Sequence, residues 1–563
     1  MARNVAIGIQ EFEKIIKSNC LYVDKTDFIK EWWDNADDVT LITRPRRFGK
    51  TLNMSMIEHF FSVNYAGRGD LFEGLSIWQH EEYRQLQGTY PVISLSFAGI
   101  KEDNYISTKE KISQLLTDLY LKNDFLRESD ALPDADKSFF NRILEVEKRE
   151  TDMTMAIHQL SKYLYNYYGK KAIIILDEYD TPMQEAYVNG YWDELVTFTR
   201  SLFNSTFKTN PYMERALMTG ITRVSKESIF SDFNNPEVVT VTSDKYATCF
   251  GFTEKEVFDA LDEYGLSDEK EQVKVWYDGF TFGKHSDIYN PWSVLNFIDK
   301  KEYATYWANT SGNRLVGKLL CEGNRNIKIS FETLLKGGTI TSPIDDQIVY
   351  NRLGDNEVAV WSLLLASGYL KVLHKEKLIR PGMRPKYTVS LTNGEVMDMF
   401  YNMVHDWFME TEVAYNDFIK ALLENDLDAM NEYMIKLTKN VFSYFDTGKR
   451  ETGLEPERFY HGFILGLLIE LDNEYILTSN RESGFGRYDV MLEPRDKTKN
   501  AYIFEFKVHK PLKEDTLEET AENALKQIEE KQYETDLIAR GIPKENIYKY
   551  GFAFSGKEVL IGT

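Results

Sequence analysis

Apolar and polar residues alternate in short segments along the first 250 residues. The strongest segment is a continuous apolar run bounded by Lys171 and Asp177. Such a run is typical of a strand buried on both faces of a parallel sheet. Together with similar runs it predicts five strands, at 39–43, 92–97, 172–176, 216–219 and 238–241. Apolar residues at helical spacing predict a helix over 51–61. We therefore expect an α/β domain with a parallel sheet over residues 1–250.

The pattern becomes helical after residue 250. Thr253 and Glu256 have the spacing of a capping box, which predicts the start of a helix. We expect a helical lid over 251–330 and a helical connecting region over 331–450. After residue 451 the sequence predicts a helix, a pair of strands and another helix, so a last domain is expected over 451–563.

Length and composition indicate a multidomain globular protein. The 563 residues exceed the roughly 250–300 that share one hydrophobic core. The three cysteines lie far apart in sequence, which argues against a disulfide framework or a cysteine zinc site. We expect a reducing, cytoplasmic location and no membrane span. The net charge of −22 argues against a general nucleic-acid coat, but it leaves room for a local basic groove.

A basic loop follows the first predicted strand, where a phosphate-binding loop belongs. Residues 44–51 read Arg-Pro-Arg-Arg-Phe-Gly-Lys-Thr. The helix that follows offers N–H groups and a positive dipole end to a phosphate. Lys50 would reach the phosphates, and the Thr51 hydroxyl would bind Mg²⁺. Arg44 stands where the usual pattern has its first glycine, so a basic surface turn is the alternative interpretation.

An acidic pair after the strand 172–176 favours the phosphate site. Ligands of parallel sheets bind at the carboxyl ends of strands, so the loop and the pair would face one crevice. Asp177 would bind Mg²⁺, and Glu178 would orient the attacking water. Arg223 follows a later strand and is a candidate arginine finger, in cis or in trans. A solvated loop arginine is the alternative interpretation for Arg223.

The first 300 residues resemble the AAA-ATPase-like family of bacterial and archaeal proteins. The resemblance is carried by segments 8–12, 22–26, 44–51, 176–180, 228–231 and 290–293. The arginine in place of the first glycine is that family's own version of the loop. The resemblance implies a P-loop NTPase domain that binds ATP and Mg²⁺, with a catalytic Glu178 beside Asp177. The nucleotide-binding residues would be Arg46, Arg47, Phe48, Gly49, Lys50, Thr51 and Arg223.

A second group of charged residues lies near the end of the chain. Asp489 stands early on one predicted strand, and Glu505 and Lys507 lie two apart on the next. Residues two apart project from the same face of a strand. Two carboxylates can hold Mg²⁺, and an adjacent ammonium can orient an attacking hydroxide. The alternative interpretation is an ordinary amphipathic strand.

Two further residues are candidates for the same site. Glu457 precedes an apolar helix and would complete the metal site, unless it only favours the helix dipole. Gln527 lies on a later helix over 521–533 and would contact the substrate or the attacking water. A solvated helix face is the alternative interpretation for Gln527.

Residues 451–563 resemble the PD-(D/E)XK nuclease superfamily. The resemblance rests on Gly484-Phe-Gly-Arg-Tyr-Asp489 and on Glu505-Phe-Lys507. It implies an αβββαβ core with Asp489, Glu505 and Lys507 as catalytic residues and Glu457, Asp489 and Glu505 as metal ligands. Tyr488 stands where proline is common before the aspartate.

The two sites together predict an ATPase coupled to a Mg²⁺-dependent nuclease. The partner would be nucleic acid, with DNA favoured over RNA, and no membrane is expected. A nucleotide-switched binding protein with a silent nuclease-like domain remains an alternative, since no basic track leads to Asp489. A signalling ATPase that forms a homo-oligomer on ATP is a third possibility, compatible with Arg223 acting in trans.

Overall fold

The computed structural model divides the chain into two compact units. The first comprises Met1–Gly323 and Lys336–Asp398, and the second comprises Asn324–Leu335 and Met399–Thr563. The second unit thus begins before the boundary predicted at residue 451. The structure describes all residues except 1–2, 224–235, 309–313, 322–323, 346–355, 377–384, 410–415, 442–467, 469–470, 472–473, 480–481, 484–485, 488, 510–513 and 556–557.

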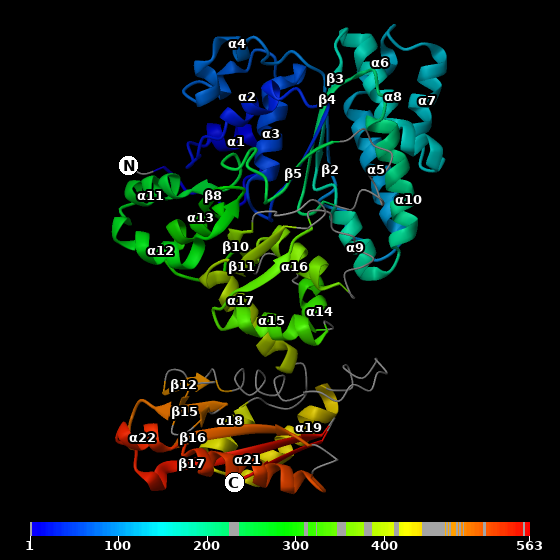
Figure 1. Ribbon diagram of the computed structural model, residues 1–563. Helices are drawn as coiled ribbons and strands as arrows, with labels where there is room; N and C mark the ends of the chain where they lie inside the picture. Colours follow the sequence, from blue (N-terminus) through cyan, green and yellow to red (C-terminus); the bar gives the residue numbers. More distant parts are fainter. Residues whose placement is uncertain are drawn as a thin grey trace. The chain divides into compact units, whose positions relative to one another are not determined.

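A five-stranded parallel sheet organises the first unit (Figure 1). Its strands are β1 (Val39–Thr43), β2 (Val92–Ser96), β3 (Ala172–Asp177), β4 (Met213–Gly220) and β5 (Glu237–Val239). They lie in the order β2-β3-β4-β1-β5, and all pairings are parallel. The predicted parallel sheet is confirmed. Because β3, β4 and β1 are neighbours and run parallel, their carboxyl ends lie at the same edge of the sheet.

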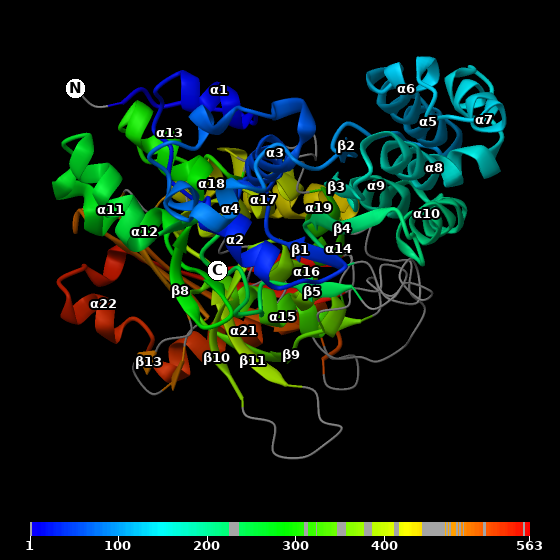
Figure 2. The same ribbon diagram turned by 90° about the horizontal axis from the view of Figure 1, so that it is seen from above.

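Helices cover both faces of this sheet. One group, with α3 following β1, packs its apolar side chains against Ile42, Ile173 and Leu217. It consists of α1 (Phe12–Lys17), α2 (Asp27–Asp34), α3 (Lys50–Phe61) and α4 (Glu81–Arg84). A second group lies on the other side of β2–β4 in both views (Figures 1 and 2). It consists of α5 (Tyr105–Lys122), α6 (Phe125–Glu128), α7 (Asp134–Leu144), α8 (Glu150–Tyr168), α9 (Thr181–Asn189) and α10 (Trp192–Phe207).

Segment 251–330 combines helices with a small sheet. The capping box at Thr253 and Glu256 is present, and it starts α11. The helices are α11 (Glu254–Glu263), α12 (Lys270–Tyr277), α13 (Pro291–Lys300) and α14 (Arg314–Cys321), and α15 (Arg325–Leu335) begins here. The strands β6 (Phe252–Thr253), β7 (Phe280–Phe282) and β8 (His285–Tyr289) pair in the order β6-β8-β7.

Residues 331–450 were predicted to be mostly helical, and the structure adds strands to the helices of this region. Three strands form an antiparallel sheet there: β9 (Ile340–Pro343), β10 (Leu370–Lys375) and β11 (Lys386–Leu391). The apolar patterns of these strands are too short to predict them, because β10 ends in exposed polar residues and β9 spans four positions. The helices of the region are α16 (Glu357–Ala366), α17 (Gly394–Met409), α18 (Asn416–Glu424) and α19 (Leu427–Val441).

A mixed five-stranded sheet organises the second unit. Its order is β12-β15-β16-β17-β18, and only β16 and β17 pair in parallel. Apolar residues of α18 and α19 cover one face, and those of α21 and the segment after it cover the other. The elements are β12 (Tyr475–Ser479), β13 (Glu482–Ser483), β14 (Gly486–Arg487), β15 (Val490–Pro494), β16 (Ala501–Val508), α21 (Leu517–Lys531), α22 (Thr535–Ala539), β17 (Ile547–Ser555) and β18 (Glu558–Gly562).

The expected αβββαβ order is matched in part. Strands β12, β15 and β16 precede α21, and β17 follows it in parallel with β16. The expected first helix lies outside the described residues.

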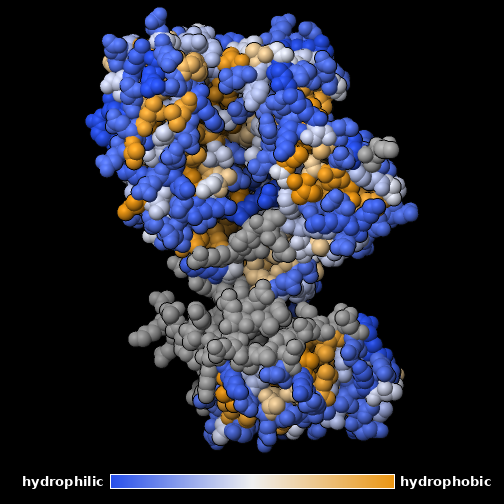
Figure 3. All heavy atoms as spheres, turned by 180° about the vertical axis from the view of Figure 1, so that it is seen from behind, coloured by the Kyte–Doolittle hydropathy of each residue, from blue (hydrophilic) through white to orange (hydrophobic). Residues whose placement is uncertain are grey.

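The described surface is largely polar. On the face seen in Figure 3, hydrophilic residues predominate and apolar residues form separate patches. None of the described helices is long and apolar enough to cross a membrane.

Candidate functional sites

The basic loop connects β1 to α3 through two residues with positive φ. Gly49 (φ 79°) is the N-cap of α3, and Arg47 has φ 64°. Positive φ is easy for glycine and costly for other residues. The loop thereby turns sharply and places Lys50 on the first turn of the helix. Its hydroxyl-bearing neighbour Thr51 follows on the same turn.

The Lys50 ammonium is buried against its own loop. Nζ donates to the carbonyl oxygens of Arg44 at 3.0 Å and Pro45 at 2.8 Å. Burial lowers the pKa of Lys50, and the carboxylates of Glu178 and Asp177 act in the opposite direction. The amine is therefore buried close to the carboxylates at the end of β3.

Arg44 is a buried structural residue. Its Nη1 donates to the carbonyls of Thr43 and Thr240 at 2.9 Å each, and its Nη2 donates to the carbonyl of Tyr246 at 3.3 Å. The guanidinium stacks 4.6 Å from the ring centroid of Phe282. Burial lowers the pKa of Arg44 to about 10. The interpretation as a basic surface turn therefore does not hold for Arg44.

The remaining loop residues contact the segment after the sheet. The Arg47 guanidinium lies 4.3 Å from the ring centroid of Trp292. Asn290 donates through Nδ2 to the Arg46 carbonyl at 3.2 Å, and it also caps α13. The ring of Phe48 packs against other aromatic side chains of β7. These contacts fix the shape of the loop from outside the sheet.

Asp177 joins the loop helix to β4. Its Oδ2 accepts from Thr51 Oγ1 at 2.7 Å, and its Oδ1 accepts from Thr219 Oγ1 at 2.5 Å. Burial raises the pKa of Asp177, while the two threonine hydroxyls lower it. Hydroxyl and carboxylate oxygens are ligands that Mg²⁺ accepts. The structure thus brings together Thr51 and Asp177, two of the predicted metal ligands.

Asp180 holds the end of β4 in place. Its carboxylate accepts from the Thr222 N–H at 2.8 Å, from the Thr222 hydroxyl at 2.7 Å and from the Ile221 N–H at 3.1 Å. A Cβ at Gly220 would lie 2.6 Å from Asp180 Oδ1 and 2.8 Å from the Tyr179 ring. Burial raises the pKa of Asp180. The role of Asp180 could not be predicted from its local sequence, because its partners lie some forty residues later.

Glu178 has the backbone geometry of a constrained site residue. Its φ is 50°, and its N–H donates to Thr219 Oγ1 at 3.4 Å. Its Oε2 accepts from Thr181 Oγ1 at 3.3 Å. Non-glycine residues with positive φ cluster at functional sites. Arg223 directly follows Thr222 and is the last described residue before 224–235.

In the second unit, Asp489 and Glu505 meet at the start of β15. Val490 pairs with Phe504, so the register places Asp489 level with Glu505 on the neighbouring strand. Asp489 Oδ2 accepts from the Phe506 N–H at 2.9 Å. Glu505 is buried. Both predicted carboxylates therefore lie at one end of the β15–β16 pair.

Gln527 links the lysine to the glutamate of this site. Its Oε1 accepts from Lys507 Nζ at 2.6 Å, and its Nε2 donates to Glu505 Oε1 and to Tyr533 Oη. The pKa of Tyr533 is raised mainly by burial, and the charges of Glu505 and Asp489 raise it further. Gln527 thus contacts both Lys507 and Glu505, and Asp489 lies level with Glu505 on the neighbouring strand. Glu457 lies outside the described residues.

Comparison with known proteins assigns each of these regions. Residues 6–230 match the family described as "Predicted AAA-ATPase", and residues 455–563 match the PD-(D/E)XK nuclease superfamily. Two separate parts of the chain are thus similar to these families, and we call them the AAA-ATPase-like domain and the PD-(D/E)XK domain. A relative from Azotobacter chroococcum mcd 1, named "Uncharacterized protein in vnfD 5'region", is 24% identical over 98% of this chain and 96% of the relative.

The AAA-ATPase-like match contains the loop, Asp177, Glu178 and Thr219 but ends before Asn290 and Trp292. These two residues contact the loop from outside the matched region. Their signal in the sequence was Asn-Pro, since asparagine favours an N-cap and proline the first helical position. The N-cap could have been found from that pair, but its contact with Arg46 could not.

Several basic residues of the PD-(D/E)XK domain are paired with carboxylates. Lys497 and Arg540 both pair with Glu493, and Lys499 pairs with Glu474. Glu493 is buried between its two cations, and these lower its pKa against the effect of burial. Lys497 and Lys499 are therefore held in ion pairs with carboxylates of this domain, whereas Lys507 donates to Gln527.

Proposed function

We propose that this protein binds and hydrolyses ATP and that its PD-(D/E)XK domain cleaves nucleic acid, DNA in preference to RNA, with Mg²⁺. The observation that carries the proposal is the convergence of Lys507 and Glu505 on one amide, Gln527, beside Asp489. The same chain contains a buried loop lysine facing Asp177. Two separate phosphate chemistries are thus supported in one polypeptide.

In the AAA-ATPase-like domain, the donor set fits a magnesium nucleotide. Thr51 and Asp177 would hold Mg²⁺, which supplies charge neutralisation at the phosphates. Arg46, Arg47, Phe48 and Gly49 would form the cradle around the phosphate chain. Glu178 would orient the attacking water, and Arg223 would neutralise charge on the γ-phosphate.

Lys50 gives this domain a means to sense nucleotide. Its ammonium now donates to the carbonyls of Arg44 and Pro45. Phosphate oxygens carry more negative charge and are stronger acceptors than carbonyls. ATP would draw Lys50 away from these carbonyls. The loop would then rearrange around the buried side chain of Arg44.

In the PD-(D/E)XK domain, Asp489 and Glu505 would hold Mg²⁺, and Glu457 would complete the ligand set. The ion lowers the pKa of bound water and neutralises the phosphodiester. Lys507 would orient the attacking hydroxide. Gln527 fixes Lys507 Nζ and Glu505 relative to each other, so both groups are positioned before substrate arrives. We also propose that the protein is located in the cytoplasm, as the cysteine pattern predicts.

The experiment measures both activities in full-length protein. ATP binding and phosphate release are compared between wild type and Lys50→Ala, with exposed Lys101→Ala as the control. Cleavage is compared between wild type and Lys507→Ala on labelled single- and double-stranded DNA and RNA in Mg²⁺. We expect Lys50→Ala to lose ATP binding and Lys507→Ala to lose cleavage, while Lys101→Ala retains both.

The outcomes separate the proposal from its alternative. Wild-type cleavage by Lys507→Ala would contradict the nuclease site, and wild-type ATP binding by Lys50→Ala would contradict the phosphate site. ATP binding without cleavage of any substrate would favour a nucleotide-switched binding protein. A mass that increases with ATP would favour the oligomerising signalling ATPase, with Arg223 acting in trans.

A further inference from the structure

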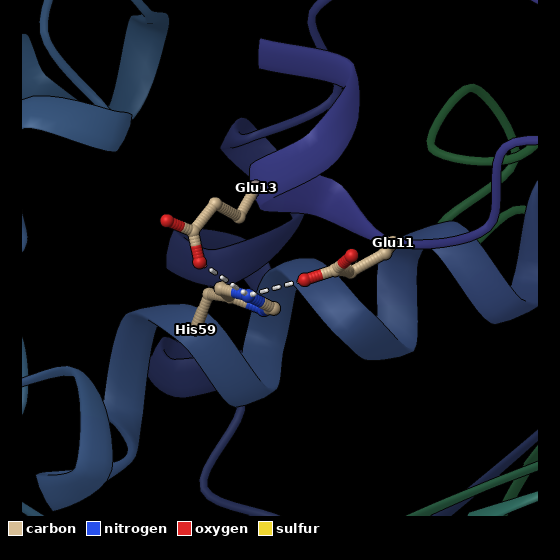
Figure 4. Close-up of side chains that lie close together, drawn as sticks. All are labelled: Glu11, Glu13 and His59. Atoms are coloured by element: carbon tan, nitrogen blue, oxygen red, sulfur yellow. Dashed lines mark ion pairs between the residues drawn. The ribbon is translucent and has the colours of Figure 1, made fainter. Parts of the chain in front are cut away.

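A histidine and two glutamates meet away from both sites, between the start of α1 and the second half of α3. His59 Nε2 lies 3.9 Å from Glu11 Oε1 and 3.9 Å from Glu13 Oε2. One ligand atom from each of the three residues lies within 4.8 Å of the others. Figure 4 shows the imidazole between the two carboxylates, with both oxygens directed at its ring nitrogen.

The two ring nitrogens of His59 have different surroundings, and Nε2 is the one that faces the two glutamates. Nδ1 lies 2.7 Å from the Ser55 carbonyl, and a carbonyl oxygen can only accept, so Nδ1 carries the proton. The neutral imidazole then has its lone pair at Nε2. His59 is 2% exposed, and Nε2 has no hydrogen-bond partner among the described residues. Metal-binding histidines characteristically donate their other nitrogen to a carbonyl in this way.

The three groups are held in position by their surroundings. The Phe12 N–H donates to Ser55 Oγ at 3.0 Å, which fixes the backbone between Glu11 and Glu13 against α3. The imidazole stacks on Tyr65 with ring centroids 4.0 Å apart. These contacts set the backbone and the ring before any ligand binds, and they leave the Glu11 side chain free to adjust.

The two oxygens of the Glu13 carboxylate contact different groups. Its Oε1 pairs with Lys17 at 2.5 Å and with Arg68 at 2.9 Å, and its Oε2 faces His59. Arg68 is shared with Asp70. Glu11, Glu13 and Asp70 carry three negative charges against the two positive charges of Lys17 and Arg68, so the group keeps a net negative charge. The Glu11 side chain is 56% exposed, which gives an ion a path from solvent.

We propose that Glu11, Glu13 and His59 bind a divalent transition-metal ion of the Zn²⁺ class. Zinc binds histidine nitrogen and carboxylate oxygen at about 2.0–2.2 Å, and three protein ligands leave a position for water. Tetrahedral ligands at that distance are ~3.3–3.6 Å apart. Both carboxylate oxygens now lie 3.9 Å from Nε2, so each must move inward by a few tenths of an ångström to reach this spacing. The ion would tie the start of α1 to the helix that begins at the phosphate loop.

The test is Zn²⁺ binding by the full-length chain in equilibrium dialysis. Excess Mg²⁺ occupies the oxygen-only groups around Asp177 and around Asp489, because Mg²⁺ prefers oxygen ligands. We expect Glu11→Gln and His59→Gln to bind one equivalent of Zn²⁺ fewer than wild type, or at least about tenfold more weakly. His80→Gln removes a histidine of the same unit and should bind like wild type.

A thermal measurement tests the same site independently of stoichiometry. Zn²⁺ should raise the melting temperature of wild type by several degrees and leave Glu11→Gln unchanged, since an ion stabilises only the state that binds it. Glu11 is exposed, so its substitution does not threaten folding. Equal Zn²⁺ binding by wild type and Glu11→Gln, or no binding by wild type, would overturn the proposal and leave the cluster an ion pair.

Discussion

The two candidate phosphate sites are built over very different sequence distances. The AAA-ATPase-like site joins Thr51 of α3, Asp177 of β3 and Thr219 of β4. The PD-(D/E)XK site joins residues of one strand pair and the helix that follows, Asp489 to Gln527. A parallel sheet needs long crossovers, whereas an antiparallel pair needs a short turn. The first site therefore depends on the whole fold of its unit.

The two lysines also differ in what holds them. Lys50 donates to backbone carbonyls of its own loop, and Lys507 donates to a side-chain amide that also contacts Glu505. In the proposed function, a nucleotide would have to displace the first set of hydrogen bonds, while the second set already orients the ammonium. This difference favours a switch in the first domain and a prearranged catalytic group in the second.

The largest effect is expected from Lys507→Ala on cleavage. Removing one electrostatic stabiliser costs about 10²–10³-fold in rate. The rate of Mg²⁺-dependent cleavage measures the effect, and ATP binding should remain at the wild-type level. Lys497→Ala is the control in the same domain, because that lysine pairs with Glu493. Equal losses in both variants would indicate a general effect of charge and would contradict a specific role for Lys507.

Arg44→Gly, which restores the usual glycine, should destabilise the first unit. It removes the donors to the carbonyls of Thr43, Thr240 and Tyr246 and leaves them buried. We expect the free energy of unfolding of that unit to fall by about 2–4 kcal/mol. Urea unfolding followed by hydrogen exchange measures it unit by unit. Arg44→Lys should lose less, and wild-type stability in Arg44→Gly would contradict the structural role.

The first unit should also depend on pH through Glu395, a buried residue that accepts from Ser293 Oγ at 2.8 Å. Burial raises its pKa from 4.5 to about 7. The native state then binds more protons than the unfolded state between these values, so stability falls as pH rises through this range. The loss is at most about 3 kcal/mol. Urea unfolding of wild type between pH 4.5 and pH 8 measures it.

Glu395→Gln should flatten this dependence, because the amide does not titrate. Glu271→Gln changes an exposed carboxylate of the same unit and should retain the wild-type slope. An unchanged slope in Glu395→Gln would show that other groups cause the pH dependence.

A smaller effect is expected from Gly220→Ala. The added Cβ would meet Asp180 Oδ1 at 2.6 Å and displace the strand end that carries Thr219. We expect about 1–2 kcal/mol of destabilisation, as in overpacked cores, together with slower ATP hydrolysis. Gly99→Ala is the matched control, since a Cβ there meets nothing within 4 Å. Equal stability of the two variants would contradict the close contact.

Much of the sheet was predictable from the sequence, because its strands are continuous apolar runs. β3 and β1 match their predicted positions to within one residue. β11 has an alternating pattern that is typical of a strand, since Tyr387, Val389 and Leu391 are its buried positions. β9 and β10 had no comparable pattern, since few of their residues are buried.

The site residues were predictable where spacing is local. Glu505 and Lys507 share a strand face, and that spacing alone placed them together. The burial of Arg44 was not predictable, because its acceptors lie about two hundred residues later and are backbone carbonyls, which no side-chain pattern reveals. The role of Asp180 was hidden for the same reason.

The most direct test of the account is the ATP dependence of cleavage. The rate on the best substrate is measured with and without ATP in wild type and in Lys50→Ala, at constant free Mg²⁺. The account predicts that ATP changes the rate in wild type and has no effect in Lys50→Ala, whose PD-(D/E)XK site is intact. An ATP effect of equal size in both proteins, or in neither, would contradict coupling between the two domains.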